Sequence, residues 1–435
     1  MYAKNKGFLG LAFIFCCSVF GQHQKPIEWA FQFGTQPLKQ EHYTSVSSTE
    51  QYREQGYGFD FNSIDAVQMH KKGMIADSSI YFSVSLPAGN YLVSMVFGSE
   101  YSPSVNSVKA ESKRLMVNQL RLKKGQYKTS EFVVHLQTKK IDSTHNINLK
   151  PREENALNWD TKLSFEFLKG TAVTHLLIHE LNEVPTLFLA GDSTVADQDL
   201  SPWASWGQFI TQYMQPSIVV ANYAASGASL SSFKARKRWD KILHLIKQGD
   251  YVMIEFGHND QKIKNEGSGP WSSYSDLLTY YVESARAKGG IPILLTPLQR
   301  RVFNKTKGIK PTHGDYPAAV RAVANSLSVP LIDLTEISTA LYESWGVDDS
   351  KNAFVHYPEN SFPGQKKALA DNTHFNDFGA HEIALCVIQG VKELDLVLKR
   401  HLKPLPRYNP KSPGSIKNWT LPMSARFEVI KPEGN

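Results

Sequence analysis

The chain contains little cysteine: three residues among 435, too few for a framework of disulfides to hold a chain of this length together. After residue 20 the sequence also has no apolar run of about 18 residues, the length that a membrane-spanning helix needs. Aromatic residues, in contrast, are plentiful, with 23 Phe, 18 Tyr and 8 Trp. This content excludes disorder as the main state of the chain. The length predicts two or three domains.

Acidic residues are fewer than basic ones, 41 against 48, which gives a formal net charge of +7. An excess of this size is compatible with binding to nucleic acid, with binding to an anionic polymer, and with no charged partner.

The N-terminal residues have the pattern of an export signal. Lys4 and Lys6 precede an apolar run over residues 8–20, and Gly21 follows it. A basic start, a short apolar run and a small residue predict a signal peptide over residues 1–21. Its removal takes two lysines and no acid, so the mature charge is 7 − 2 = +5. We therefore expect an exported protein, periplasmic or extracellular, with no membrane span in the mature chain.

Two alternatives to cleavage remain at this terminus. The segment is either an uncleaved anchor or the site of a lipid on Cys16 or Cys17, although the Phe-Ile-Phe before Cys16 lacks the small residue typical of lipidation. Cleavage leaves Cys386 without a cysteine partner. Because Cys386 lies within an apolar run, we expect it to be a core residue.

Residues 22–183 alternate between apolar and polar positions, with turn signals such as Pro87-Ala88-Gly89-Asn90 between the runs. Short strands without helical periodicity predict an antiparallel β-sandwich of galactose-binding-like type. The runs are 80–86, 91–97, 115–122, 131–136, 163–167 and 175–181.

From residue 184 to about 400 the pattern becomes strand, loop, helix. Strands that alternate with helices predict a parallel sheet covered on both faces, a three-layer α/β/α architecture. Residues 401–435 are rich in Pro, Lys and Ser, and we expect this extension to wrap the surface or to be partly mobile. The predicted strands are 186–190, 218–221, 251–256, 291–295 and 330–334, and the predicted helices include 239–247, 276–288 and 318–327.

Candidate reactive groups follow the predicted strands, where the carboxyl ends of a parallel sheet collect them. The blocks are Gly191-Asp192-Ser193-Thr194-Val195, Asn222-Tyr223-Ala224-Ala225-Ser226-Gly227, Gly257-His258-Asn259-Asp260 and Asp371-Asn372-Thr373-His374-Phe375.

These blocks contain the parts of a hydroxyl nucleophile site. Ser193, at a strand end just before a predicted helix, is placed as the nucleophile, and its N–H is placed as an oxyanion donor. Gly227 offers a backbone N–H and Asn259 an amide donor. His374 is the candidate base, and Asp371, within one turn of it, is placed to orient the imidazole.

Each block has an ordinary structural explanation when taken singly. Gly-Asp-Ser is common as a turn and helix cap, the asparagine and glycine blocks as polar loops, and Asp-x-x-His as a cap with a surface histidine. What favours catalysis is that all four blocks occur at successive strand ends of one predicted sheet.

In this order the four blocks resemble the SGNH hydrolase superfamily, also called GDSL esterases, over residues 185–395. The resemblance is closer to the rhamnogalacturonan acetylesterases of bacterial pectin degradation, and the Gly-x-Ser-x-Gly elbow of the rival α/β-hydrolases is absent. The motifs that carry this closer resemblance are Gly191–Val195, Trp206-Gly207-Gln208, Thr296-Pro297, Arg300-Arg301, His313–Pro317 and Asp371–Phe375 with Gly379-Ala380.

The resemblance implies a flavodoxin-like SGNH domain over residues 184–400 and a serine esterase activity. It implies a Ser193–His374–Asp371 triad, with Ser193, Gly227 and Asn259 forming the oxyanion hole. The implied substrate is an acetylated, acidic pectic polysaccharide. No cofactor and no metal are expected, because the sequence shows no clustered His and Cys ligands.

Other residues near the blocks have supporting roles. We expect Asp192, Asn222 and Asp260 to hydrogen-bond the loops that carry Ser193 and Gly227, although Asp192 is also explained as a plain cap. For His258 a structural role is favoured.

The basic segments 234–238 and 300–310 are either a solvated surface or an attraction for uronate carboxylates. Arg300 and Arg301 belong to the second segment, and His313 and Tyr316 either line the sugar cleft or form a turn. Nucleic acid is disfavoured by export and by the esterase blocks. The sequence does not indicate an oligomeric state.

Two other functions remain open. One is deacetylation of another plant polysaccharide such as xylan. The other is a non-catalytic carbohydrate-binding protein whose sandwich stacks sugars on aromatic side chains, although packing explains the same residues: Trp29, Tyr43, Tyr52, Tyr57 and Tyr81.

Overall fold

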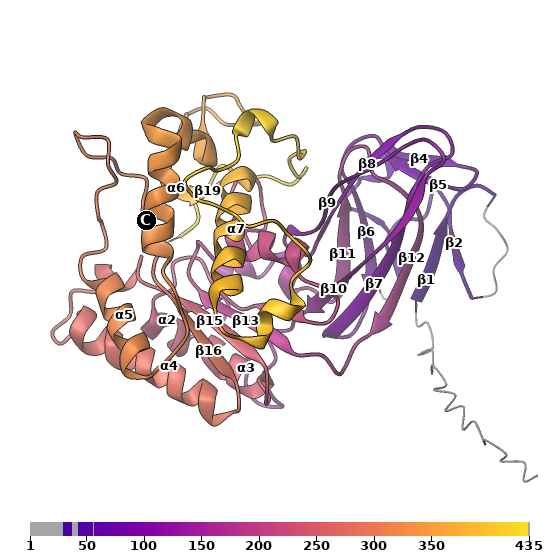
Figure 1. Cartoon of the computed structure of the whole chain (residues 1–435). Coiled ribbons are helices and arrows are strands. Elements are labelled where there is room, and N and C mark those ends of the chain that lie inside the picture. The colour runs from indigo at the N-terminus through magenta and orange to yellow at the C-terminus, as the bar shows by residue number, and fades with distance from the viewer. Residues whose placement is uncertain (1–28, 37–41, 55, 434–435) are drawn as a thin grey trace, which may run out of the picture.

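The computed structural model describes residues 29–36, 42–54 and 56–433 (Figure 1). The predicted signal peptide, and the alternatives at Cys16 and Cys17, lie outside these residues. Two mainly antiparallel sheets form the N-terminal part, and a parallel sheet with helices on both faces forms the rest. The predicted fold class is therefore confirmed.

The N-terminal sheets stack as a sandwich. One has seven strands, with β10-β7-β12-β1-β2 as its main path and β5 and β4 joined to β12, and the other has the order β3-β6-β11-β8-β9. The strands are β1 (Trp29–Phe33), β2 (Thr44–Val46), β3 (Tyr57–Asp60), β4 (Val67–His70), β5 (Gly73–Ala76), β6 (Ile80–Ser85), β7 (Gly89–Gly98), β8 (Ser104–Ala110), β9 (Arg114–Leu122), β10 (Tyr127–Leu136), β11 (Lys162–Phe167) and β12 (Ala172–Glu180).

The alternation seen in the sequence forms the core of this sandwich. Along β7, Tyr91, Val93, Met95 and Phe97 are buried, while the residues between them are partly exposed. Successive side chains of a strand point to opposite faces, so this pattern turns one face of each sheet inward. The core thus follows directly from the period of two.

The aromatic residues proposed for sugar stacking are used in packing contacts. The ring of Tyr57 lies 4.8 Å from that of Phe31, and Tyr81 is buried. Trp29 meets Tyr91 edge to face. Tyr43 contacts His175 and Tyr52 lies under the Lys162 ammonium. These contacts favour the packing explanation.

The parallel sheet has the strand order β14-β13-β15-β16-β17, which is the flavodoxin-like order 2-1-3-4-5. Its strands are continuous apolar runs because helices cover both faces. In β13, Leu187 and Leu189 pack on one side and Phe188 and Ala190 on the other. The strands are β13 (Thr186–Gly191), β14 (Val219–Asn222), β15 (Tyr251–Glu255), β16 (Ile291–Leu295) and β17 (Leu331–Ile332).

Helices α1, α6 and α7 pack on the face of Leu187, and α2 to α5 pack on the face of Phe188. A separate antiparallel pair, β18 (Phe354–Tyr357) and β19 (Leu369–Phe375), precedes the last long helix. The helices are α1 (Trp206–Phe209), α2 (Leu230–Ala235), α3 (Arg238–Leu245), α4 (Ser275–Ala287), α5 (Tyr316–Ser326), α6 (Leu334–Asp349) and α7 (Asp377–Glu393). No helix among the described residues has the length and apolar character to cross a membrane.

The sandwich and the α/β part share a buried boundary, on which β9 and β10 face the α/β part (Figure 1). Leu115 and Leu168 of the sandwich pack into the apolar core of the α/β part. The ammonium of Lys109, fully buried, donates to Asp377 at 2.7 Å and to Ser424 at 2.9 Å. Lys113 donates to the carbonyl of Trp203. Polar and apolar contacts therefore join the two parts.

Residues 401–433 run back over both parts of the molecule. Leu402 and Leu421 pack into the core of the α/β part, and Ser424 donates to Glu166 of the sandwich. Arg426 then pairs with Asp199 at 2.9 Å. The described part of the extension thus wraps the surface.

We predict that Lys109→Met lowers the free energy of unfolding by about 3–5 kcal/mol, because it leaves the Asp377 carboxylate buried without its cation. Lys72 provides a matched control. Its pair with Glu100 is exposed, so Lys72→Met should cost less than about 1 kcal/mol. Denaturant unfolding measures both, and equal losses for the two variants would contradict the prediction. Adding Asp377→Asn to Lys109→Met should recover part of the loss.

Candidate active site

A hydroxyl, an imidazole and a carboxylate form one hydrogen-bonded chain at the edge of the parallel sheet. His374 Nε2 lies 2.8 Å from Ser193 Oγ, and His374 Nδ1 lies 2.8 Å from Asp371 Oδ2. All three side chains are buried. Burial raises the pKa of the Asp371 carboxyl, but hydrogen bonds from His374 and from the N–H of Thr373 outweigh it and hold that pKa below its usual value. The carboxylate is therefore ionised beside the imidazole.

Asp371 and His374 lie on β19, in extended backbone, and not within a helical turn as the sequence suggested. The Asp371 side chain nevertheless reaches His374, because it turns back along its own strand. Its Oδ1 accepts the N–H groups of Thr373 and His374. Backbone bonds from Ala204 to Phe375 and from Arg301 to Asn372 fix this strand against the α/β part.

Ser193 follows β13 without the helix that we expected after it. The chain makes a single turn closed by the Ala196 N–H on the Asp192 carbonyl, and α1 begins thirteen residues after Ser193, at Trp206. Side chains hold this turn in place of a helix. Gln198 donates to the Ser193 carbonyl at 2.8 Å.

The two other predicted oxyanion donors lie on loops that are bonded to each other. Gly227 has φ +74°, a conformation that favours glycine. The Asn259 amide donates to the Ala228 carbonyl at 3.0 Å, one residue beyond Gly227. Since an amide nitrogen carries two N–H groups, this bond uses one of them.

The three supporting polar residues contact these loops as follows. Asp192 accepts the N–H and hydroxyl of Thr194. Asn222 donates to the Val195 carbonyl at 2.7 Å. Asp260 Oδ1 accepts the Leu230 N–H at 2.8 Å. The bonds of Asp192 thus lie within the Ser193 turn, that of Asn222 links the end of β14 to this turn, and that of Asp260 links the turn after β15 to the start of α2.

His258 is buried, and its Nδ1 approaches Asp192 Oδ2 to 3.4 Å. Burial is the largest effect on both groups. It lowers the pKa of His258. It raises the pKa of Asp192, but the interaction with the His258 side chain and the bonds from Thr194 outweigh burial and hold that pKa below its ordinary value. His258 is thus packed in the interior against Asp192, and its structural role stays a prediction.

The predicted substrate-contact residues are engaged with the protein itself. The Arg300 guanidinium donates to the His258 carbonyl and lies 3.3 Å from His313 Nε2. Arg301 donates to Ser350, Val347 and the Asn372 side chain. Tyr316 donates its hydroxyl to the Asp260 carbonyl. Arg301 is thereby bonded to β19 and Tyr316 to the Asp260 turn, and a contact of either side chain with substrate stays a prediction.

Residues 189–381, which contain all of these groups, match the model of the GDSL-like lipase/acylhydrolase family. A relative from Bacillus subtilis, the rhamnogalacturonan acetylesterase RhgT, is 44% identical over 218 residues that cover 50% of this chain and 93% of that protein. The chain belongs to the GDSL-like lipase/acylhydrolase family. It is an ester hydrolase.

Two further relatives extend the comparison. A rhamnogalacturonan acetylesterase of Emericella nidulans is 25% identical and covers 52% of this chain and 91% of its own. The uncharacterized esterase YxiM of Bacillus subtilis is 26% identical, with 85% of this chain and 91% of its own covered. The YxiM alignment therefore also includes residues of the sandwich.

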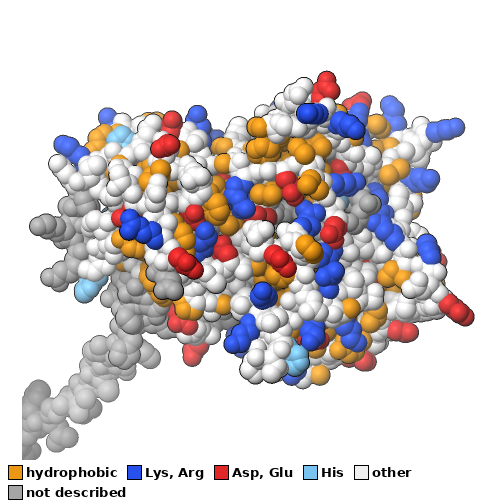
Figure 2. All heavy atoms as spheres, turned by 180° about the vertical axis from the view of Figure 1, so that it is seen from behind, with side chains coloured by type: hydrophobic (Ala, Val, Ile, Leu, Met, Phe, Trp, Pro, Cys, Tyr) orange, Lys and Arg blue, Asp and Glu red, His pale blue; other side chains and the backbone are white. Residues whose placement is uncertain are grey.

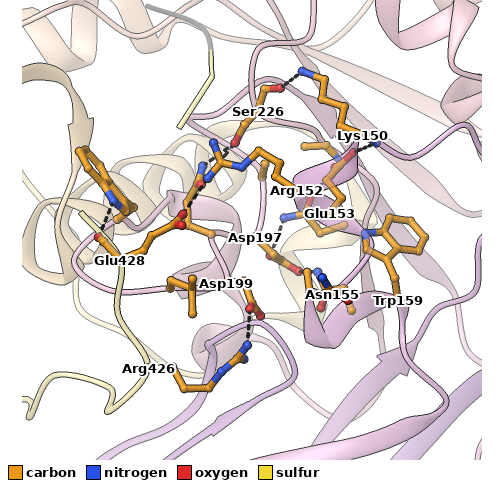
Figure 3. A pocket seen from close by; sticks show the side chains of 18 of the residues that line it. Lys150, Arg152, Glu153, Asn155, Trp159, Asp197, Asp199, Ser226, Arg426 and Glu428 are labelled. Carbon is orange, nitrogen blue, oxygen red and sulfur yellow. Dashed lines mark hydrogen bonds and ion pairs between the residues drawn. The ribbon is translucent and has the colours of Figure 1, made fainter. Parts of the chain in front are cut away.

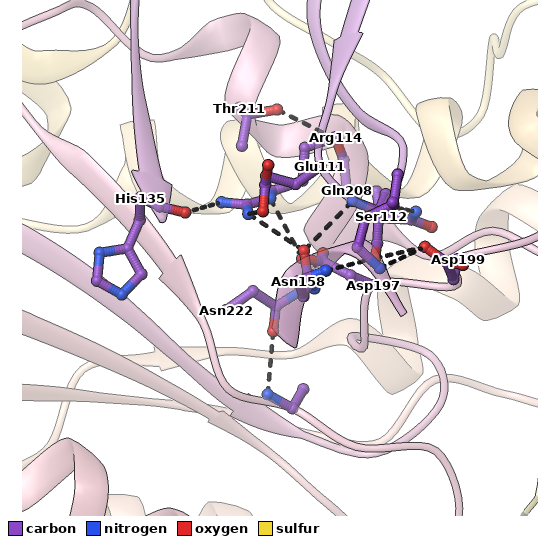
Figure 4. A network of polar contacts seen from close by, with 12 residues as sticks. Glu111, Ser112, Arg114, His135, Asn158, Asp197, Asp199, Gln208, Thr211 and Asn222 are labelled. Atoms are coloured by element: carbon purple, nitrogen blue, oxygen red, sulfur yellow. Dashed lines mark hydrogen bonds and ion pairs between the residues drawn. The ribbon is translucent and has the colours of Figure 1, made fainter. Parts of the chain in front are cut away.

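In this GDSL-like hydrolase a buried polar network reaches the Ser193 turn from the sandwich (Figure 4). Arg114 of β9 lies with its Nε 3.3 Å from Asp197 Oδ2, and both side chains are buried. Asp197 Oδ1 accepts from Asn222, which also donates to Val195. Burial raises the pKa of Asp197, and the nearby Arg114 guanidinium opposes this effect by stabilising the carboxylate.

Sequence reasoning singled out Asn222 of this network but missed Arg114 and Asp197. Arg114 carries no motif, and it belongs to the other domain, so no local pattern connects it with Ser193. Asp197 and Gln198 follow the serine block closely in sequence. An acidic and an amide side chain so near the candidate nucleophile were the available signal. Glu255, at the end of β15, accepts from Trp206 at 2.7 Å and was also not singled out.

Within the described ranges, no group of three or more His, Cys, Asp or Glu residues has the arrangement of a metal site. The groups that the site offers are those of acid–base and nucleophilic chemistry.

We predict a pH effect from Asp260, whose pKa burial raises to about 7. The unfolded carboxyl titrates near about pH 3.9. Between these values the folded chain keeps a proton that the unfolded chain loses, so this contribution to stability is complete below about pH 4 and is lost as the pH rises through about 7.

Asp260→Asn cannot ionise. Its free energy of unfolding, relative to wild type, should therefore rise between about pH 4 and pH 7 and then level off. Denaturant unfolding at several pH values measures this difference. Asp65→Asn, at an exposed position, serves as the control. A difference that does not change with pH would contradict the raised pKa.

Proposed function

We propose that this hydrolase is a serine esterase that removes O-acetyl groups from a pectic polysaccharide, rhamnogalacturonan, through a Ser193–His374–Asp371 triad. The observation that carries the proposal is the continuous hydrogen-bonded chain from Ser193 Oγ through the imidazole to Asp371, with 2.8 Å at both contacts. A hydroxyl nucleophile needs this arrangement of base and orienting acid.

In the proposed reaction Ser193 Oγ attacks the acetyl carbonyl carbon while His374 Nε2 takes the hydroxyl proton. The tetrahedral intermediate collapses, the C–O bond to the sugar breaks, and His374 returns the proton to the sugar oxygen. Water then attacks the acetyl-serine ester, His374 takes one of its protons and returns it to Ser193 Oγ, and acetic acid leaves and ionises to acetate in solvent. Asp371 stays ionised and holds Nδ1–H, so that Nε2 faces the serine.

The N–H groups of Ser193 and Gly227 and the Asn259 amide would bind the oxyanion. Removing one such donor typically lowers turnover by about 10²–10³. The bond from Asn259 to the Ala228 carbonyl supports this assignment, because it fixes the amide next to the glycine loop before substrate arrives.

The substrate is proposed from the relatives. RhgT and the Emericella nidulans protein are both named rhamnogalacturonan acetylesterases, and they align over 93% and 91% of their own lengths. A polymer outside the cell agrees with the export that residues 1–21 predict.

The overall positive charge gives little direction to this proposal. On the face in Figure 2, Lys and Arg side chains are interspersed with Asp and Glu and form no continuous basic patch among the described residues. An acidic polymer would therefore be recognised by particular cations and not by the field of one broad surface.

We predict that Ser193→Ala and His374→Ala each lower turnover of p-nitrophenyl acetate by about 10⁵–10⁶ while the folded protein keeps its melting temperature within a few degrees. Ser47→Ala, at an exposed position of the sandwich, is the matched control and should retain wild-type turnover. Near-normal turnover in Ser193→Ala would refute the triad.

The same preparation should release acetate faster from acetylated rhamnogalacturonan than from acetylated homogalacturonan or acetylated xylan. Preference for xylan would replace the proposed substrate and keep the mechanism. The Ser193→Ala protein reports any contaminating esterase in each assay.

A further inference from the structure

The segment 428–433 lies across the proposed active site. Lys431 Nζ is 3.3 Å from Asp371 Oδ2. Glu433 forms an ion pair with Lys150, and the same ammonium donates to the Ser226 carbonyl, next to Gly227, at 2.5 Å. These contacts bring the segment from the carboxylate of the triad to the glycine loop.

The segment is close enough to Gly227 to fill the space there. A Cβ built on this glycine would lie 2.9 Å from the Cβ of Glu433 and 3.0 Å from Lys150 Nζ. Pro432, between Lys431 and Glu433, is buried. An acyl group bound against Gly227 would therefore compete with Glu433 for space.

A cavity of about 170 Å³ lies beside this segment, between the sandwich and the α/β part (Figure 3). Lys150 and Arg152 of the sandwich line it together with Ser226 and Gln198. Gln198 also bonds the Ser193 carbonyl, so the cavity adjoins the nucleophile turn.

The acidic residues that line this cavity, together with Glu433 beside it, divide into two groups. Three pair with cations that lie outside the segment 428–433: Asp197 with Arg114, Asp199 with Arg426 and Glu153 with Arg238. The two remaining pairs join a sandwich cation to an acid of the segment. They are Arg152 with Glu428, at 2.9 Å, and Lys150 with Glu433. These five ion pairs all lie within the part of the chain that the structure describes.

The two segment acids differ from the fixed acids in how easily they are replaced. The Lys150 side chain is 10% exposed, whereas that of Glu433 is 49% exposed. An incoming carboxylate would form with Lys150 the same charge pair that Glu433 gives up, so the exchange costs little and the half-exposed Glu433 side chain returns to solvent. The cation stays in place, because the Ser226 carbonyl also holds it.

We propose that Lys150 and Arg152 form a subsite for the carboxylates of an acidic saccharide chain, and that Glu433 and Glu428 occupy it in the absence of that chain. The sandwich then contributes directly to substrate selection, and the segment is displaced when an acidic polymer binds. This inference rests on the proposed function, because Lys150 and Arg152 would bind the uronate carboxylates of the proposed pectic substrate.

Binding of an unacetylated galacturonate oligomer to the full-length Ser193→Ala protein, measured by calorimetry, tests the subsite without turnover. Adding Lys150→Met or Arg152→Met should weaken binding about tenfold, the value of one charge-assisted hydrogen bond. Lys124→Met, which removes an exposed lysine of the sandwich, should leave the affinity unchanged. Arg152 is the more exposed of the two cations, so its variant retains the fold if Lys150→Met does not.

Affinities of the Lys150→Met and Arg152→Met proteins equal to that of Lys124→Met would overturn the subsite. So would equally tight binding of a neutral xylose oligomer, since the subsite recognises carboxylates.

A chain that ends at Val429 tests displacement, and it keeps the backbone bonds of Glu428 to Ser201 and Trp203. It should bind the galacturonate oligomer several-fold more tightly and hydrolyse p-nitrophenyl acetate with a lower KM. Unchanged affinity and unchanged KM would overturn the proposed occupation of the subsite. A failure of the proposed function would give a different result: the wild-type protein would release no acetate, although the galacturonate oligomer would still bind normally.

Discussion

The contact on which the rest of the structure depends is the buried ion pair between Arg114 of the sandwich and Asp197 of the esterase part. A guanidinium removed from water is tolerated where its donors are satisfied. The terminal nitrogens of Arg114 donate to the His135 carbonyl at 3.0 Å and to Asn158 at 3.2 Å, both in the sandwich, and its Nε faces Asp197 of the esterase part as an ion pair at 3.3 Å. Since desolvation offsets most of the attraction within such a pair, we interpret its main effect as fixing one arrangement of the two parts.

The reactive groups depend on that arrangement through Asn222. Asp197 orients the Asn222 amide, the amide holds the Val195 carbonyl, and the turn between Asp197 and β13 carries Ser193. His374 arrives independently on β19, which the backbone of Arg301 and Ala204 holds. Two rigid supports thus meet at the 2.8 Å contact between Ser193 and His374. The sandwich therefore helps to position the reactive groups, and we propose that it also supplies cations that select the substrate.

Local patterns in the sequence predicted much of the fold. A period of two predicted the sandwich strands, and apolar runs followed by polar blocks predicted the parallel sheet and the residues at its strand ends. Predictions failed where distant residues decide the structure. The turn after β13 is not helical because Gln198 and Asn222 bind it, and Asp371 lies on a strand because β18 and Ala204 pair with that segment.

The roles of particular side chains were the hardest to predict. Arg301 and Tyr316 stand in motifs near the site, but their hydrogen bonds are to Val347 and to the Asp260 carbonyl. Arg114 and Lys150 stand in no motif, yet both reach loops of the other domain. A side chain's neighbours across a domain boundary are set by the packing of the whole chain, which a single sequence does not encode in its local spacing.

The central claim is that the sandwich positions the Ser193 turn, and the most direct test is the turnover of p-nitrophenyl acetate by Arg114→Lys and Arg114→Met. The rate is divided by the fraction of active sites that a fluorophosphonate titrates, so that unfolded protein does not count. We predict that kcat per titrated site falls by up to about 100-fold, the cost of misplacing a reacting group by about 1 Å, with the larger loss in Arg114→Met. An unchanged kcat per titrated site in both variants would contradict it.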